Sequence, residues 1–185
     1  MELTANVYYD DLVESCKQGH SLSFKELYQR YTKAMYNTSL RIVNNAVDAE
    51  DIVQESFIDA FKNIERFNYQ STFGAWLKRI VINKSINHLR DKKLKLVEIN
   101  QTMVSELESD EAFDEAEIKF KVEKIKKAVS MLPDGYRTVF TLNAFEGYDY
   151  DEIAEILSIT PATVRTQYHR AKKQLLLFIV SNKLS

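Results

Sequence analysis

Apolar residues recur every three or four positions along most of this chain, and this spacing predicts amphipathic helices. The pattern is clearest in residues 48–64, whose predicted buried stripe consists of Ala49, Ile52, Val53, Phe57, Ala60, Phe61 and Ile64. Asp48 is the predicted N-cap of this helix, and acidic residues follow in its first turn, where the helix dipole favours them. The same period predicts further helices over residues 6–18, 24–43, 73–91, 116–132 and 136–145.

A pair of helices is predicted near the C-terminus, in residues 149–178. The first helix is short, with Ile153, Ala154 and Leu157 on one face. The sequence Ser158-Ile159-Thr160 forms the predicted turn, in which Thr160 is a good N-cap and Pro161 occupies the first helical position. The buried stripe of the second helix consists of Val164, Tyr168, Ala171 and Leu175.

The opposite side of this second helix is polar and basic. Its residues are Ala162, Arg165, Thr166, His169, Arg170 and Lys173, and no acidic residue occurs from Pro161 to the C-terminus. A helix with one buried stripe and an outer face of Arg, Lys and Thr suits the major groove of DNA. The alternative is an ordinary helical hairpin with a solvated face, although such faces usually mix both signs of charge.

Two other segments carry candidate contact residues. In residues 48–64, a face opposite the buried stripe holds Asp51, Gln54, Glu55 and Ile58, which suits a basic protein partner, or else is a solvated face with one stray isoleucine. In residues 73–91, the first half is predicted to be core. The second half presents Lys84, His88 and Arg90 beside Asn83 and Asn87, amides and cations that suit a surface that opens DNA strands.

A short polar loop, residues 66–72, precedes that helix and contains Phe67 and Tyr69. Phe73 and Trp76 are expected in the core, whereas Phe67 and Tyr69 are the aromatic residues expected to be exposed for stacking on bases.

The net charge of −2 conceals a strongly uneven distribution. Residues 76–97 carry 7 basic and 1 acidic residues, residues 98–123 carry 2 and 9, and residues 161–185 carry 5 and 0. Two basic blocks separated by an acidic one indicate two DNA contacts on one chain. The expected fold is all-α: two small helical domains, residues 1–95 and 116–185, joined by an acidic flexible linker at 96–115.

Composition excludes several other classes. Only 4 glycines and 2 prolines occur among 185 residues, which disfavours a turn-rich β fold. The sequence has no stretch of about 18 apolar residues and no signal peptide at its start, so a cytoplasmic location without membrane insertion is expected. His20, His88 and His169 lie far apart, Cys16 is expected to be buried, and there is no phosphate loop or nucleophile motif. No metal, cofactor, catalytic residue or enzymatic activity is therefore expected.

Taken together, the chain resembles a bacterial RNA polymerase sigma factor of the sigma-70 family, in its extracytoplasmic-function (ECF) branch. Three stretches carry the resemblance: DAEDIVQESFIDAF (48–61), STFGAWLKRIVINKSINHLRDKK (71–93) and LPDGYRTVFTLNAFEGYDYDEIAEILSITPATVRTQYHRAKKQL (132–175). They are similar to the family's polymerase-docking helix, its −10-element helix and its −35-element helix-turn-helix domain.

The resemblance implies roles for named residues. Asp51, Gln54, Glu55 and Ile58 would contact the β′ clamp helices of the polymerase. The −10 element, melted into single strands, would meet Phe67, Tyr69, Asn83, Lys84, Asn87 and His88, with a flipped base captured by the 66–72 loop. The double-stranded −35 element would meet Thr163, Arg165, Thr166, His169, Arg170 and Lys173.

The implied activity is promoter recognition and the start of transcription, as a dissociable subunit of the core enzyme. Further implied partners are the β flap of the polymerase and an anti-sigma factor. Two other interpretations stay open at this point. One is a free-standing helix-turn-helix regulator that binds an operator as a dimer, and the other is an adaptor that binds proteins only.

Overall fold

The computed structural model describes residues 10–95 and 124–180, and within these ranges every regular element is helical. The chain divides into two compact units, residues 1–88 and 89–185, which are described separately. The predicted all-α fold is thereby confirmed. The predicted acidic linker, residues 96–115, lies outside the described residues, as does the first part of the helix predicted over 116–132.

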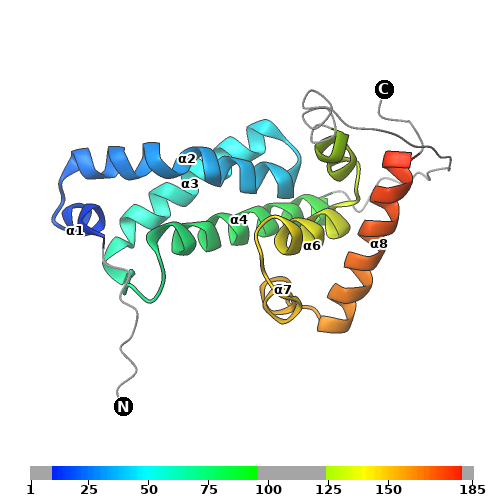
Figure 1. The fold of residues 1–185 in the computed structure, drawn as a ribbon. Helices are drawn as coiled ribbons and strands as arrows, with labels where there is room; N and C mark the ends of the chain where they lie inside the picture. The colour runs from blue at the N-terminus through cyan, green and yellow to red at the C-terminus, as the bar shows by residue number, and fades with distance from the viewer. Residues whose placement is uncertain (1–9, 96–123, 181–185) are drawn as a thin grey trace, which may run out of the picture. The chain divides into compact units, whose positions relative to one another are not determined.

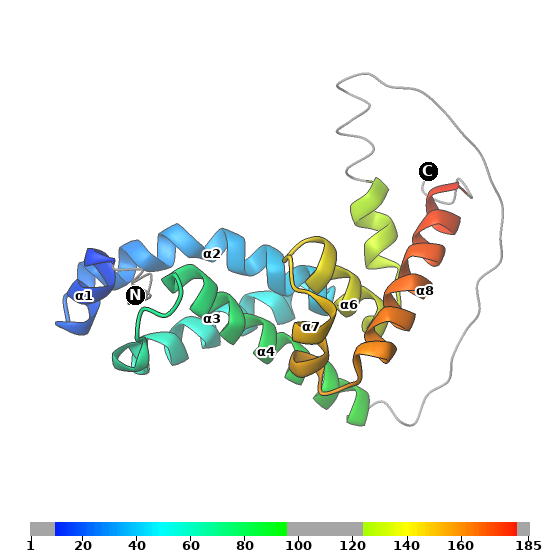
Figure 2. The same cartoon turned by 60° about the horizontal axis from the view of Figure 1, so that its bottom comes forward.

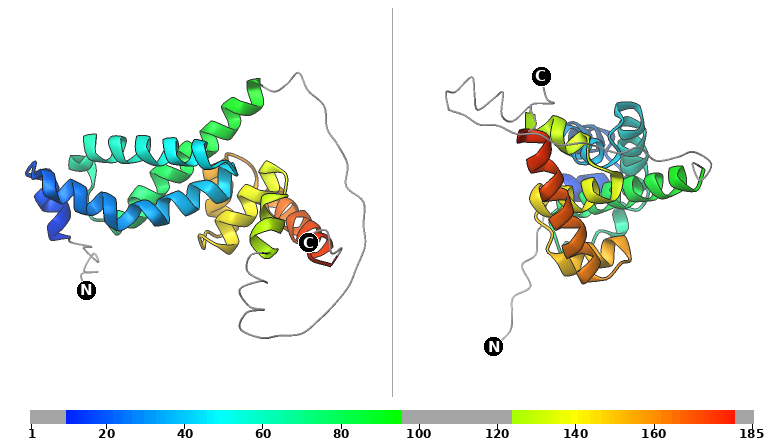
Figure 3. Two further views of the ribbon diagram at one scale, coloured as in Figure 1. Left: turned by 90° about the horizontal axis from the view of Figure 1, so that it is seen from above. Right: turned by 90° about the vertical axis from the view of Figure 1, so that its right-hand side faces the viewer.

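In its described residues, the first unit contains three α-helices, one short 3-10 helix and most of a fourth α-helix (Figure 1). They are α1 (Asp11–Lys17), α2 (Ser21–Val43), α3 (Ala46–Lys62), η1 (Ile64–Arg66) and α4 (Phe73–Lys95). The long helices α2 and α3 pack side by side (Figure 3). Leu27, Met35 and Ile42 of α2 are buried, and so are Ile52, Val53 and Phe57 from the stripe predicted for α3.

The turn between α2 and α3 is built from two asparagines. Asn44 ends α2 in the left-handed conformation, with a φ of 55°, which asparagine tolerates better than most residues. Asn45 is the N-cap of α3, and its side-chain oxygen accepts a hydrogen bond of 3.0 Å from the backbone N–H of Asp48. The prediction that Asp48 is the N-cap is therefore wrong, because the helix begins earlier and its cap is supplied by Asn45.

Helix α4 approaches α2 closely at two points. The hydroxyl groups of Ser39 and Ser85 share a buried hydrogen bond of 3.0 Å. Near the start of α4, a Cβ atom added to Gly74 would lie 2.7 Å from the ring of Tyr31, so glycine permits this approach. Leu77, Val81 and Ile82 fill the adjoining core, while the predicted core residue Ile80 is only half-buried.

The second unit is made of a helical segment at residues 124–130, α6 (Asp134–Ala144), α7 (Tyr150–Leu157) and α8 (Pro161–Val180). One core cluster of this unit consists of Ala128, Val129, Leu132, Ala171, Leu175 and Phe178, with Tyr136 and Phe140 packed against it. Two predictions fail here. The apolar spacing of the helix predicted over 116–132 places Ile125 in its buried stripe, but this side chain is 41% exposed. Asp134 and Gly135 lie in the first turn of α6, because Pro133 occupies the N-cap position.

A buried arginine stabilises the start of α6. Arg137 is 4% exposed, and its guanidinium donates a hydrogen bond of 2.7 Å to the backbone carbonyl of Leu132 and pairs with Asp134 at 2.5 Å. Arg137 therefore supplies a hydrogen-bond donor to the segment just before α6. Without it, the buried carbonyl of Leu132 would lack this donor. In the part of the chain that the structure describes, no helix is long and apolar enough to cross a membrane.

Candidate nucleic-acid interface

Helices α7 and α8 form the predicted helix-turn-helix (Figure 2). Asp149 caps α7, and with Glu152 it completes a reciprocal capping box. The turn is closed by Ser158, which adopts the left-handed conformation at a φ of 57°. Thr160 then caps α8, its hydroxyl accepting a hydrogen bond of 3.2 Å from the N–H of Thr163, as predicted. Both helix ends are thus fixed by local hydrogen bonds, which sets the direction of α8.

The inner side of α8 is fixed by packing. Val164, Ala171 and Leu175 are buried, and Tyr168 stacks on Phe140 of α6 with ring centroids 5.8 Å apart. The two rings are nearly parallel, at 15°. This packing fixes the rotation of α8 about its own axis, and hence which side chains face outward.

All of the predicted contact residues of α8 lie on the exposed side: Ala162, Thr163, Arg165, Thr166, His169, Arg170 and Lys173. Within the described residues, the cationic side chains of Arg165, Arg170 and Lys173 have no acidic partner. Two hydroxyl groups are used locally, since Thr163 pairs with Thr160 and Thr166 donates to the carbonyl of Ala162 at 2.9 Å. Among the described residues, the outer face of α8 therefore carries positive charge that no acidic side chain neutralises.

The loop between η1 and α4 departs from its prediction. Phe67 was expected to be exposed, but it is only 2% exposed. Its ring packs on Phe73 and Trp76 of α4, with centroid distances of 5.9 and 5.4 Å. The reason is that the loop folds back over the first turn of α4, where these aromatic rings provide an apolar surface. Phe73 is buried, as expected for a core residue, whereas Trp76, which was also expected in the core, is only half-buried.

Tyr69 is half-buried, and the exposed side chains of the loop are polar. Asn68, Gln70 and Thr72 face solvent, although Thr72 also caps α4 by accepting a hydrogen bond of 3.2 Å from Ala75 N–H. Asn68 and Gln70 were not among the predicted site residues. The sequence does carry a signal for them, because an amide residue flanks Tyr69 on each side. When the aromatic residues of such a loop pack on the core, the amides are the side chains that remain exposed.

Along α4, one exposed stripe contains Arg79, Asn83 and Asn87, at successive intervals of four residues. The two asparagines share a face, as predicted. Arg79 was not among the predicted contact residues, although the same spacing of four residues places it on this face. The stripe therefore combines two amides with a cation one turn before them.

Lys84 and His88, which were also predicted to meet DNA, have their polar ends directed at α3. The Nζ atom of Lys84 lies 2.8 Å from Oδ2 of Asp59 and 3.3 Å from Oε2 of Glu55. The hydrogen bond to Asp59 is the main cause that raises the pKa of Lys84 above its usual range. His88 Nε2 lies 3.0 Å from Oδ2 of Asp48. Both side chains join α4 to α3, and a contact with DNA stays a prediction for them.

The predicted contact face of α3 is exposed. Asp51, Gln54 and Glu55 are solvent-accessible, and Ile58 is 50% exposed in spite of its apolar side chain. We call these four residues the outer α3 face. Gln54 also borders a shallow groove between α2 and α3, with a volume of about 520 Å³. Its walls include the aromatic rings of Tyr28 and Tyr36. This surface combines two carboxylates, an amide and an apolar anchor.

Among the described residues, no group of three or more His, Cys, Asp or Glu side chains could hold a metal ion. Cys16 is buried, as predicted, and burial raises the pKa of its thiol to about 11. At neutral pH this thiol is therefore protonated and a poor nucleophile.

Comparisons with known proteins match two stretches of the chain and identify its family. The sequence profile described as "Sigma-70 region 2" matches residues 27–94, which include α3 and all but the last residue of α4. The profile described as "Sigma-70, region 4" matches residues 123–175, which include α6, α7 and most of α8. Two ECF RNA polymerase sigma factors are similar over most of the chain. SigW of Bacillus subtilis is 33% identical, covering 88% of this chain and 92% of the relative. The sigma-E factor of Haemophilus influenzae is 32% identical, covering 89% and 91%.

Solved structures share the fold. A structure of the sigma factor RpoE with the anti-sigma factor NepR from Bartonella quintana has a TM-score of 0.57 at 21% identity, and covers 84% of this chain and 96% of that one. A structure of CnrH with the cytosolic domain of CnrY has a TM-score of 0.53 at 23% identity, covering 89% and 92%. With both sigma-70 regions present and identity of 33% across nearly its whole length, this chain belongs to the ECF sigma factors of the sigma-70 family.

Proposed function

We propose that this sigma factor brings core RNA polymerase to promoters by three surfaces: the outer α3 face, the exposed stripe of α4 with its preceding loop, and the outer face of α8. The observation that carries the proposal is the acid-free outer face of α8 on the same chain as the outer α3 face. One surface suits a nucleic acid, and the other suits a basic protein.

The outer α3 face would bind the β′ clamp helices of the polymerase. Glu55 is partly neutralised by Lys84 at 3.3 Å, whereas Asp51 has no ion pair within the described residues. Asp51 is therefore the carboxylate most available to a basic partner. Ile58 would supply the apolar contact beside it, since interface anchors are apolar residues surrounded by polar ones.

At the −10 element, Asn83 and Asn87 would read base edges and Arg79 would hold a phosphate. The loop before α4 would capture a base that leaves the stack, a step that costs a few kcal/mol and has to be offset by binding. Asn68 and Gln70 are the exposed hydrogen-bonding groups of that loop. Tyr69 would offer the exposed part of its ring, and Phe67 would act from beneath by anchoring the loop on α4.

At the −35 element, α8 would enter the major groove. Arg165, Thr166 and His169 occupy its first turns after the cap, where recognition helices usually meet base edges. Arg170 and Lys173 lie further along the exposed side and would contact phosphates, which adds affinity without sequence preference.

The polymerase would carry out all catalysis, so this chain would need neither an active site nor a cofactor. The core enzyme and the promoter are cytoplasmic in bacteria, and this is the proposed location. The β flap of the polymerase and an anti-sigma factor are proposed as further partners. The second of these is supported by the anti-sigma complex of the structurally similar RpoE.

A free-standing operator-binding dimer is not favoured. The helix-turn-helix alone is compatible with such a regulator. It does not, however, account for the outer α3 face or for the amide stripe of α4, neither of which a simple dimeric repressor requires.

Transcription in vitro with purified core polymerase and a library of promoter fragments tests the proposal. The chain should make core polymerase start at a defined subset of fragments that share two sequence blocks. If core polymerase with and without the chain gives the same transcripts, the proposed function is wrong.

A further inference from the structure

Helix α1 lies before the residues that match sigma-70 region 2, yet its side chains contact the loop between η1 and α4. We propose that Glu14 and Lys17 of α1 are positioning residues, which hold the 67–72 loop in the conformation that meets promoter DNA. This inference rests on the proposed function, because it assigns a consequence to the loop's role at the −10 element.

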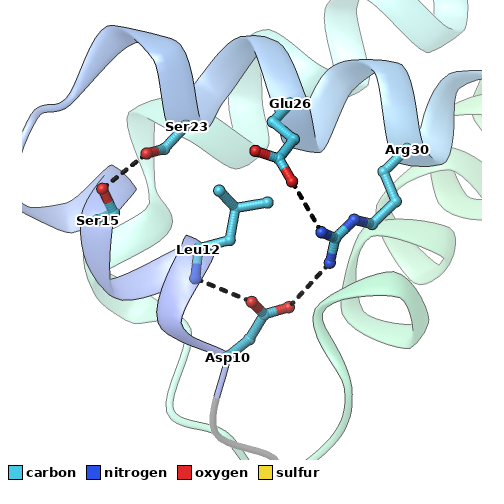
Figure 4. Close-up of polar contacts among 6 residues, drawn as sticks. All are labelled: Asp10, Leu12, Ser15, Ser23, Glu26 and Arg30. Atoms are coloured by element: carbon cyan, nitrogen blue, oxygen red, sulfur yellow. Dashed lines mark hydrogen bonds and ion pairs between the residues drawn. The ribbon is translucent and has the colours of Figure 1, made fainter.

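Helix α1 is itself fixed on α2 (Figure 4). Asp10 caps α1 by accepting a hydrogen bond of 3.0 Å from Leu12 N–H, and its other oxygen lies 3.9 Å from the guanidinium of Arg30. The hydroxyl of Ser23 donates to that of Ser15 at 2.7 Å. Val13 and Cys16 of α1 are fully buried. A helix of only two turns is therefore held by contacts along one whole side.

The other side of α1 reaches the loop through Glu14 and Lys17. The Nζ atom of Lys17 donates to the backbone carbonyl of Phe67 at 3.1 Å and lies 4.3 Å from the centre of the Tyr69 ring. The phenol of Tyr69 donates a hydrogen bond to Oε1 of Glu14. Lys17 and Glu14 also pair with each other at 3.3 Å. Two neighbouring side chains thus make three contacts with the loop.

The loop has a conformation that requires such support. Tyr69 adopts a φ of +58°, in the left-handed region that a bulky residue rarely occupies and that surrounding contacts have to stabilise. Phe67 fixes the start of the loop from the apolar side, by packing on α4. Glu14 and Lys17 fix Tyr69 from the polar side, which leaves Asn68 and Gln70 exposed on either side of it.

The charge state of this cluster is suited to a constant role. The hydrogen bond from Tyr69 is the main cause that lowers the pKa of Glu14 below its usual range. The carboxylate is therefore ionised at neutral pH, and it accepts the hydrogen bond that the phenol donates. The lysine side chain is largely covered, at 15% exposure, so it is held in place rather than sampling solvent.

The test compares Glu14→Gln, Lys17→Met and Tyr69→Phe in the full chain with core polymerase. Matched controls are Asp11→Asn, which removes another carboxylate of α1, and Lys25→Met, which removes an exposed lysine of α2. Two readouts are used: the rate at which −10 thymines become reactive to permanganate, and the ratio of open-complex rates on promoters that differ only at the captured base. Affinity for core polymerase and the thermal midpoint serve as checks on folding.

We expect Glu14→Gln and Lys17→Met to slow opening by roughly tenfold and to reduce the base discrimination, because hydrogen bonds to charged groups are among the stronger ones. Core affinity and the thermal midpoint should match the controls. Lys17→Arg, which keeps a donor and a cation over the ring, should restore most of the rate. The double variant Glu14→Gln/Tyr69→Phe should open promoters no more slowly than the slower of the two single variants. The reason is that both substitutions remove the same hydrogen bond between Tyr69 and Glu14.

The inference is overturned if the variants open promoters at the wild-type rate with unchanged discrimination. It is equally overturned if every loss follows a fall in the thermal midpoint, because α1 would then only stabilise the fold. Failure of the proposed function has a different signature: the wild-type chain itself would not open any promoter with core polymerase.

Discussion

The ammonium group of Lys84 lies 2.8 Å from Oδ2 of Asp59 and thereby joins α4 to α3. Replacing Lys84 by Met should lower the free energy of unfolding at pH 7 by about 1 kcal/mol, since a partly exposed ion pair contributes little more than this. Urea denaturation of Lys84→Met and Asp59→Asn, singly and combined, measures the coupling. A coupling of zero would contradict a stabilising role for the pair.

The pH dependence of this contribution follows from the sign of the pKa shift. The pKa of Lys84 is raised in the fold, mainly by Asp59, so the stabilisation is fully present below the unfolded pKa and is lost as pH rises through the folded one. The difference between wild type and Lys84→Met should therefore be constant near pH 8 and shrink above about pH 10.5. A separate measurement tests whether Lys84 also contacts a DNA phosphate. In that case, Lys84→Met would reduce the slope of log affinity for DNA against log salt concentration by about 1.

The outer α3 face is expected to carry the affinity for core polymerase. Asp51→Lys should weaken core binding by at least about tenfold, because a like charge facing a basic partner is repulsive. The fold should be unaffected, since Asp51 is exposed and has no ion pair among the described residues. Glu55→Lys is a less clean test, because it would also place a lysine beside Lys84.

Fluorescence anisotropy with the labelled chain and purified core polymerase measures the loss of core affinity. The control is Asp11→Lys, the same substitution at an exposed position of α1. Equal affinities for Asp51→Lys and Asp11→Lys would remove the outer α3 face from the binding surface.

The amides of α4 are expected to act in strand opening. Asn83→Ala and Asn87→Ala should reduce permanganate reactivity of the −10 thymines by about tenfold each, while −35 duplex binding stays the same. Gln18→Ala, which removes an exposed amide elsewhere, should open promoters as wild type does. Footprints of the asparagine variants that match wild type would show that this stripe does not meet the melted strand.

Arg165 is expected to read the −35 element. Arg165→Ala should cost roughly 1–3 kcal/mol at one or two base pairs and leave the preference at the others intact. Binding to a set of single-base −35 variants separates the two cases, with Lys173→Ala as the comparison. Equal weakening on every sequence would make Arg165 a phosphate contact, like the one expected for Lys173.

The helices and their exposed faces could be predicted because each depends on local spacing. The spacing of the apolar residues was sufficient to predict that Asp51, Asn83 and Arg165 lie on the exposed sides of α3, α4 and α8. The cap of α3 was misplaced because Asn45 and Asp48 are both good caps, and only the paired turn with Asn44 decides between them. Such choices depend on the preceding helix.

Contacts between segments that are distant in the sequence could not be predicted from the spacing of residues. Tyr69 and Glu14 are separated by 55 residues, and nothing in the spacing of either segment indicates their hydrogen bond. Phe67 was expected to be exposed because it lies in a polar loop, but the loop folds back onto rings of α4. Burial of a loop residue is set by that tertiary packing, which periodicity within one element does not report.

The central claim is that the chain recognises promoters as a subunit of core polymerase. Measuring promoter binding with and without core polymerase tests this claim most directly. A labelled promoter duplex should be bound at specific −10 and −35 sequences by the chain together with core enzyme, and the Asp51→Lys variant should lose this binding in proportion to its core affinity. The account would be contradicted if the chain alone, as a dimer, occupied a palindromic duplex with the same affinity whether or not core polymerase was present.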